Sequence, residues 1–104
     1  MKRIINNKRY DTDTAAKIAS WENGFSSNDI HYCKETLYLT KNGAFFLVGE
    51  GGALSAYSQS CGSNSRGGGS ELLPFSEKEA REWLEEHDCT DELEELFGSG
   101  IIDA

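Results

Sequence analysis

The strongest pattern in the chain is a pair of apolar runs on either side of Asn42-Gly43, in the stretch LYLTKNGAFFLV. Asn-Gly suits the two positive-φ positions of a type I′ turn, so the pattern predicts a two-residue β-hairpin over 37–48. Strict alternation gives this hairpin a purely apolar, core-facing side: Leu37, Leu39, Phe46 and Val48. The other side is mixed, and we expect it to be covered by the chain or kept for a partner: Tyr38, Thr40, Phe45 and Leu47.

Two short elements are predicted ahead of this hairpin. Residues 2–6 and 8–10 have strand character and flank Asn6-Asn7, which predicts a small hairpin with those two residues in the turn. The next four residues, 11–14, offer N-cap side chains to a short helix over AAKIASW. Asn23-Gly24 is expected to end that helix, because glycine suits the left-handed C′ position.

The last third of the chain has helical periodicity. Residues 71–75 are predicted to form a short strand, and Pro74 restricts it to an edge of the sheet or marks the end of the strand. Ser76 and Glu79 then match a capping box. The helix that follows places apolar or aromatic side chains at positions i, i+3, i+4 and i+7 of one face: Ala80, Trp83, Leu84 and His87. A second short helix is predicted over 90–97, with Gly98 as its terminator.

Together these elements predict an α+β fold, a small antiparallel sheet centred on the 37–48 hairpin and packed with a short N-terminal helix and two acidic C-terminal helices. A chain of 104 residues has room for one modest core. We therefore expect a single domain over 1–98 and a frayed tail over 99–104. No apolar run approaches the roughly 18–20 residues of a membrane span, and we expect no secretory signal in MKRIINNKRY, because it contains no apolar h-region. A cytoplasmic protein with no membrane partner is expected.

The net charge of −8 is concentrated at the C-terminal end. Residues 76–97 contain ten acids and only two bases, whereas residues 1–75 are nearly neutral. Such a segment repels nucleic acid and favours a basic protein partner. It can also be just the solvated side of two helices. The acids that we select as partner-binding candidates are Glu82, Glu85, Glu86, Asp91, Glu92 and Glu95.

Basic residues gather instead at the N-terminal hairpin, beside Tyr10. Cations next to an aromatic side chain are a minimal RNA-binding footprint, although on an acidic protein they also serve to keep an edge strand soluble. A glycine- and serine-rich loop over 60–70 could add backbone amides for a phosphate, but it matches no nucleotide-binding pattern. The candidate RNA or phosphate contacts are Lys2, Arg3, Lys8, Arg9 and Arg66.

Histidine and cysteine are the remaining candidates for chemistry. His31-x-Cys33 and His87-x-Cys89 have the right residue types for zinc, but the spacing is poor because no CxxC pair is present. Cys61, in the glycine-rich loop, has no catalytic signature around it. We therefore expect reduced thiols, no metal, no cofactor and no catalytic residues.

Three stretches carry a resemblance to a known group of proteins: IINNKRYDT (4–12), GEGGAL (49–54) running on to SCG (60–62), and residues 74–86 with their EAxxWL core. Together they resemble small proteins carried by mobile genetic elements of Gram-positive bacteria. Some members of that group are similar to anti-CRISPR proteins directed against type II systems. The Asn6-Asn7 turn departs from the Asn-Gly turn expected of the group.

The resemblance implies a phage or mobile-element protein that acts in the cytoplasm of a bacterial host cell and blocks a type II RNA-guided nuclease or its guide-RNA complex. Because such a nuclease holds its guide–target duplex in a positively charged channel, the acidic helices could compete for that channel by charge. Two alternatives stay open. One is an RNA-processing enzyme that acts on guide RNA, and the other is a small accessory interaction domain of a mobile element. An exposed hairpin edge also leaves room for a homodimer.

Overall fold

The computed structural model describes residues 1–53, 55–57, 59–60 and 66–104, with the backbone alone for 59, 60 and 66. Residues 53–58, where the spacing of Leu54 and Tyr57 predicts a short helical turn, and the glycine-rich loop over 60–70 lie partly outside the described residues. The described elements are β1 (Lys2–Ile5), β2 (Lys8–Asp11), β3 (Ala16–Glu22), β4 (Cys33–Leu39), β5 (Phe45–Gly51), β6 (Gln59–Ser60), β7 (Arg66–Gly67), β8 (Gly69–Phe75), α1 (Glu77–Glu86), α2 (Thr90–Phe97) and a 3-10 turn, η1 (Gly98–Gly100).

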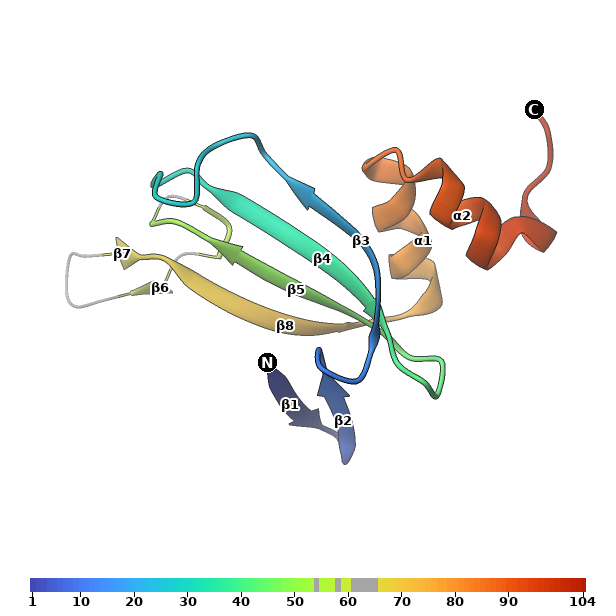
Figure 1. Ribbon diagram of the computed structural model, residues 1–104, viewed down its shortest axis with the longest axis horizontal. Helices are drawn as coiled ribbons and strands as arrows, with labels where there is room; N and C mark the ends of the chain where they lie inside the picture. Colours follow the sequence, from blue (N-terminus) through green and yellow to red (C-terminus); the bar gives the residue numbers. More distant parts are fainter. Residues whose placement is uncertain (54, 58, 61–65) are drawn as a thin grey trace.

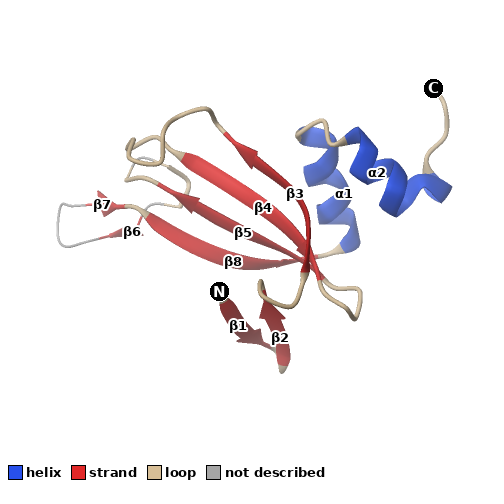
Figure 2. Cartoon of the chain, in the orientation of Figure 1, coloured by secondary structure: helices blue, strands red, loops and turns tan. Residues whose placement is uncertain are grey.

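Four antiparallel strands form the central sheet, in the order β3-β4-β5-β8. The β1–β2 hairpin lies below this sheet in Figure 1 and the two helices lie at its right-hand end, while β6 and β7 make a short separate pair. Figure 2 shows that both helices belong to the C-terminal part of the chain. The α+β class is therefore confirmed, and so is the edge position of the strand that contains Pro74.

The predicted N-terminal hairpin is also present. Ile5 pairs with Lys8, and both turn residues have positive φ, 53° for Asn6 and 64° for Asn7. This is the backbone that a type I′ turn needs, and asparagine tolerates it. Tyr10 of β2 packs edge-on against Phe46 of the central sheet, with the ring centroids 5.6 Å apart.

The predicted N-terminal helix is wrong, because residues 16–22 form strand β3. A turn precedes the strand, in which the Ala15 N–H donates to Asp11 O over 3.0 Å. The strand pairs with β4 through an irregularity between Lys17 and Ala19. That irregularity breaks the period of two, which is why the apolar spacing of Ile18, Ala19 and Trp21 looked helical. So short a helix is marginal alone, whereas strand pairing satisfies the same backbone along β4.

The turn of the 37–48 hairpin differs from the prediction by one residue. Gly43 has a φ of 87°, its N–H donates to Thr40 O over 3.0 Å, and the Thr40 N–H donates to Ala44 O over 2.8 Å. This is a three-residue loop with glycine in the left-handed position, the arrangement of a type I turn followed by a bulge. Leu39 consequently pairs with Phe45 instead of the predicted Phe46.

A shift of one residue moves every side chain of β5 to the opposite face. Phe45 and Leu47, predicted on the mixed outer side, are buried beside Leu37 and the helices. Phe46 lies on the other face and stacks on Tyr38 with the ring centroids 5.1 Å apart. The proposed outer face is therefore wrong as a functional candidate, because its Phe45 and Leu47 belong to the core.

The core has one cluster on each face of the sheet. On the helix side, buried residues of β4 and β5 meet α1: Leu37, Phe45, Leu47, Ala80, Trp83 and Leu84. On the hairpin side, β2, β5 and β8 supply Tyr10, Phe46 and Leu72. The two-sided burial explains why β5 is almost continuously apolar.

Candidate interaction surface on the C-terminal helices

Helix α1 begins at the predicted capping box. The Ser76 hydroxyl accepts the Glu79 N–H over 3.1 Å, and the Ser76 N–H donates to the Glu79 carboxylate over 2.9 Å. Because this cap fixes the start of the helix, its apolar residues, Ala80 among them, all turn toward the sheet. The acids of the helix are left on the opposite side.

A tight reversal connects the two helices. The Cys89 N–H donates to Leu84 O over 2.9 Å and the Asp88 N–H to Glu85 O over 3.2 Å, while Asp88 has a φ of 56°. This is a Schellman arrangement with an aspartate in the left-handed position. It turns the chain so that α2 packs against α1.

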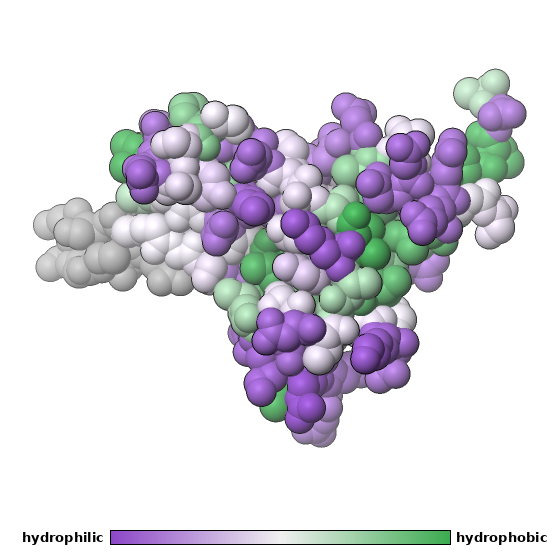
Figure 3. Space-filling view, viewed as in Figure 1, coloured by the Kyte–Doolittle hydropathy of each residue, from purple (hydrophilic) through white to green (hydrophobic). Residues whose placement is uncertain are grey.

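The six selected acids lie on the outward sides of these helices and make up the acidic surface. Five are exposed, and Glu92 is half-buried. Figure 3 shows hydrophilic side chains over this helical end, beside the apolar residues of the C-terminal tail. The two bases of the segment are partly engaged, since Lys78 lies 3.9 Å from Glu82 and the Arg81 guanidinium lies 5.7 Å from the centre of the Phe97 ring. The surface is therefore strongly negative.

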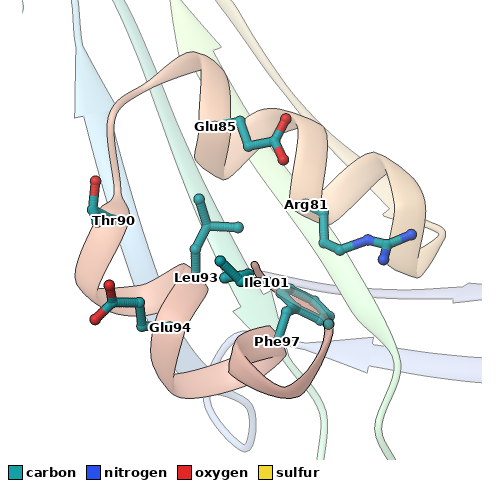
Figure 4. Close-up of a pocket in the computed structure, with 8 residues that line it drawn as sticks. Arg81, Glu85, Thr90, Leu93, Glu94, Phe97 and Ile101 are labelled. Carbon is teal, nitrogen blue, oxygen red and sulfur yellow. The ribbon is translucent and has the colours of Figure 1, made fainter. Parts of the chain in front are cut away.

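A groove of about 300 Å³ lies between the helices and the start of the tail. In Figure 4, Leu93, Phe97 and Ile101 lie together at its centre, and charged or polar side chains surround them. The residues from α2 recur at i, i+3, i+4 and i+7, so they form one stripe of that helix. The full lining is Arg81, Glu85, Thr90, Leu93, Glu94, Phe97, Gly100 and Ile101.

A polar network that the sequence did not reveal ties the helical end to the sheet. Glu35, on the helix-side face of β4, accepts hydrogen bonds from the Trp83 indole N–H, over 3.0 Å, and from the Tyr57 hydroxyl. His87 Nε2 lies 3.7 Å from the same carboxylate, between the rings of Trp21 and Trp83. Because the Glu35 side chain is only 19% exposed, its carboxylate needs hydrogen-bond partners from the protein. The only sequence signal is an acid at an inward position of a strand, in line with Leu37.

Tyr57 gives the network a pH dependence. Burial, and after it the hydrogen bond and negative charge of Glu35, raise the pKa of the Tyr57 phenol well above its ordinary value. An unfolded tyrosine ionises near pH ~10. The stabilisation is therefore complete below about pH 10 and is lost as the pH rises further, because the unfolded chain then holds fewer protons than the folded one.

We expect alkaline titration of the protein to show that Tyr57 ionises only as the fold is lost. Ultraviolet absorbance of tyrosinate, followed together with circular dichroism, measures this. The Tyr57→Phe variant is the control and should lack the delayed step. A wild-type titration in which every tyrosine ionises before the circular dichroism changes would contradict the expectation.

Four of the five basic candidates lie on the β1–β2 hairpin, which packs on the face of the sheet opposite the helices. Lys2, Arg3, Lys8 and Arg9 are all exposed on the β1–β2 hairpin. The Arg3 guanidinium donates to Leu72 O over 2.9 Å, so it binds the hairpin to edge strand β8. Arg66 belongs to β7, and its side chain lies outside the described part of the chain. The RNA-contact role stays a prediction.

The surroundings of Cys33 and Cys89 disfavour the thiolate form that acts as a nucleophile or metal ligand. Burial raises the pKa of both Cys33 and Cys89, with Glu35 adding to it at Cys33 and Glu92 and Asp88 adding to it at Cys89. Both are therefore neutral near pH 7, and a neutral thiol is a weak nucleophile and metal ligand. No group of three metal-ligating side chains occurs among the described residues. Cys61 lies outside them.

No family model, curated protein or solved structure matches the chain. The resemblance to proteins of mobile elements, the CRISPR-related partners, the homodimer and the cytoplasmic location therefore stay predictions. Within the described residues, no helix has the length and apolar character needed to cross a membrane.

Proposed function

We propose that this protein is a stoichiometric inhibitor that binds a type II RNA-guided CRISPR nuclease, or its guide-RNA complex, through the acidic surface of α1 and α2. The observation that supports the proposal best is the large excess of acids over bases on two adjacent short helices. Ten acids and two bases occur over residues 76–97, and the two bases are turned toward Glu82 and Phe97.

The physical basis is competition by charge. A nuclease of this class holds its guide–target duplex in a positively charged channel. A protein surface of opposite sign is attracted to such a channel, binds it faster at low salt, and excludes the duplex while it stays bound. The short helices present their acids from a packed scaffold, so binding requires little ordering of the chain.

Reversal of three acids is expected to weaken inhibition about tenfold and to reduce its dependence on salt, because each exposed charge contributes only a few tenths to one kcal/mol. The variant is Glu86→Lys, Asp91→Lys and Glu95→Lys, three exposed residues outside the groove. Inhibition of target cleavage by the purified nuclease, measured over a range of salt concentrations, gives the result.

A matched control separates the acidic surface from net charge. Asp13→Lys, Glu22→Lys and Glu71→Lys change the net charge by the same amount at exposed positions away from the helices. This control should inhibit almost as well as wild type. Unchanged inhibition by the helix variant, or equal loss in both variants, would contradict binding through the acidic surface.

The broader alternatives are tested in the same experiments. Guide RNA incubated with the purified protein should keep its length, and shortened RNA would indicate an RNA-processing enzyme instead. In cells, expression of the protein should preserve a plasmid that a type II nuclease targets. Loss of that plasmid would favour an accessory interaction domain without a role against CRISPR systems.

A further inference from the structure

Apolar side chains and acids meet at one place on the helical end, the groove between α1 and α2. Leu93 and Phe97 lie at its centre, and Ile101, which is 47% exposed, extends it along the tail. Glu85 and Arg81 stand on the α1 wall, with the Arg81 guanidinium 5.7 Å from the centre of the Phe97 ring, and Glu94 stands on the α2 wall. The groove is thus an apolar hollow with acids on both sides.

We propose that this groove anchors an apolar side chain from a basic amphipathic helix of a protein partner. The inference rests on the proposed function and names the kind of surface that the inhibitor would bind. A helix that carries Leu, Ile or Phe at spacings of i, i+3 and i+4 can place one residue in a groove, while flanking Lys or Arg side chains reach the acids on either side.

Size and charge both favour this occupant. A volume of about 300 Å³ is at the lower end of the range for small-molecule sites, which suits one or two buried side chains. Nucleic acid is disfavoured, because the acids of both walls would face its phosphates. The acidic surface continues past the groove along both helices, so a basic segment of several turns meets mostly favourable charge, with Arg81 as the one base of the groove lining.

The groove is expected to affect mainly the dissociation rate of the partner, and the acidic surface mainly its association rate. Charges at the rim of an interface mainly steer the encounter and change the association rate, whereas a desolvated apolar anchor mainly sets the dissociation rate. A change in the groove should therefore weaken binding equally at low and high salt. A change in the acids should weaken it mostly at low salt.

A synthetic amphipathic helix of leucine and lysine, with its leucines at helical spacing, is the probe. A peptide of the same composition in scrambled order is its control, since it carries the same charge without an apolar face. Biosensor kinetics at several salt concentrations should show binding of the ordered peptide at least about tenfold tighter than the scrambled one, as one or two buried apolar side chains imply.

Two neighbouring isoleucines offer a matched pair of variants. Ile101 lines the groove, while Ile102 is 89% exposed and does not. Ile101→Ser should raise the dissociation rate of the ordered peptide about tenfold, and Ile102→Ser should leave it within about twofold. Both positions lie beyond the two helices, so circular dichroism should show the fold unchanged.

A variant that fills the groove with a large side chain gives a complementary test. Thr90 is exposed at the first position of α2 and lines the groove, so Thr90→Trp should occupy the groove and block the ordered peptide. Equal binding of the ordered and scrambled peptides, or unchanged binding by Ile101→Ser and Thr90→Trp, would overturn the inference.

The two proposals fail in distinguishable ways. A groove that does not bind the peptide, in a protein whose acids still inhibit the nuclease, would overturn the groove and leave the proposed function standing. A groove that binds the peptide, in a protein that inhibits no nuclease, would support the anchor and contradict the proposed function.

Discussion

Replacement of Trp83 by alanine is expected to lower the free energy of unfolding by about 3–5 kcal/mol, the usual cost of removing a large aromatic side chain from a core. Trp83 is 6% exposed, packs with Leu37, Phe45 and Leu84, and donates its indole N–H to Glu35. The variant loses both the packing and a hydrogen bond to a carboxylate. Urea denaturation followed by circular dichroism measures the change.

Trp83→Phe separates these two contributions. An aromatic ring is kept, but the pyrrole part of the indole is lost together with its N–H, so the expected cost is about 1–3 kcal/mol, smaller than that of Trp83→Ala and mostly that of a hydrogen bond to a charged group. Glu82→Ala, one residue earlier on the exposed side of α1, is the matched control and should stay within about 0.5 kcal/mol of wild type. A cost below about 1 kcal/mol for Trp83→Ala would show that Trp83 does not join α1 to the sheet.

This tryptophan matters for the proposed function because the helices present the acids. Trp83 and His87 both reach Glu35 from α1, and α2 packs on α1. Loosening α1 therefore also moves α2 and opens the groove. We expect Trp83→Ala to lose inhibition at temperatures where Trp83→Phe still inhibits, even though neither variant changes an acid of the surface.

The sequence was most informative where the signal is local. The capping box at Ser76, the periodicity of α1 and α2, and the Asn6-Asn7 turn all depend on residues within a few positions of one another, and all are present in the structure. The outward position of the acids followed from the same periodicity.

The errors arose where distant parts of the chain decide the outcome. The 37–48 hairpin was assigned a two-residue turn because Asn42-Gly43 fits one, but packing of Phe45 and Leu47 against α1 requires the other register. Residues 15–21 were predicted as a helix because their apolar side chains have a helical spacing, which the structure explains by the irregularity in β3.

The candidate site was predictable only in part. The acids could be selected from helical periodicity, because each helix has one buried face. The groove could not, since it depends on how α2 folds back on α1 and where Ile101 lies. The Glu35 network joins residues 22 and 48 positions apart in the sequence, and no pattern within one element indicates such a pairing.

Replacement of Gly49 by alanine is expected to cost about 2–3 kcal/mol, even though it adds a single methyl group. Gly49 is buried in β5, and a Cβ at this position would overlap the ring of Tyr57, which lies across it. Tyr57 can escape only by leaving its buried site, where it is 8% exposed, and by giving up its hydrogen bond to Glu35. The loss is therefore that of burying a large side chain.

A double-mutant cycle gives this explanation a sharp test, because the clash disappears when the ring is absent. Gly49→Ala made in a Tyr57→Ala background should cost less than about 1 kcal/mol, so the two changes should be strongly non-additive, as expected for residues in contact. The alkaline titration should agree with the cycle, since expelled Tyr57 would ionise near pH ~10 in Gly49→Ala with the fold still intact. If the stability costs of Gly49→Ala and Tyr57→Ala were additive in urea denaturation, Gly49 would be required for the backbone of β5 and not to leave space for the Tyr57 ring.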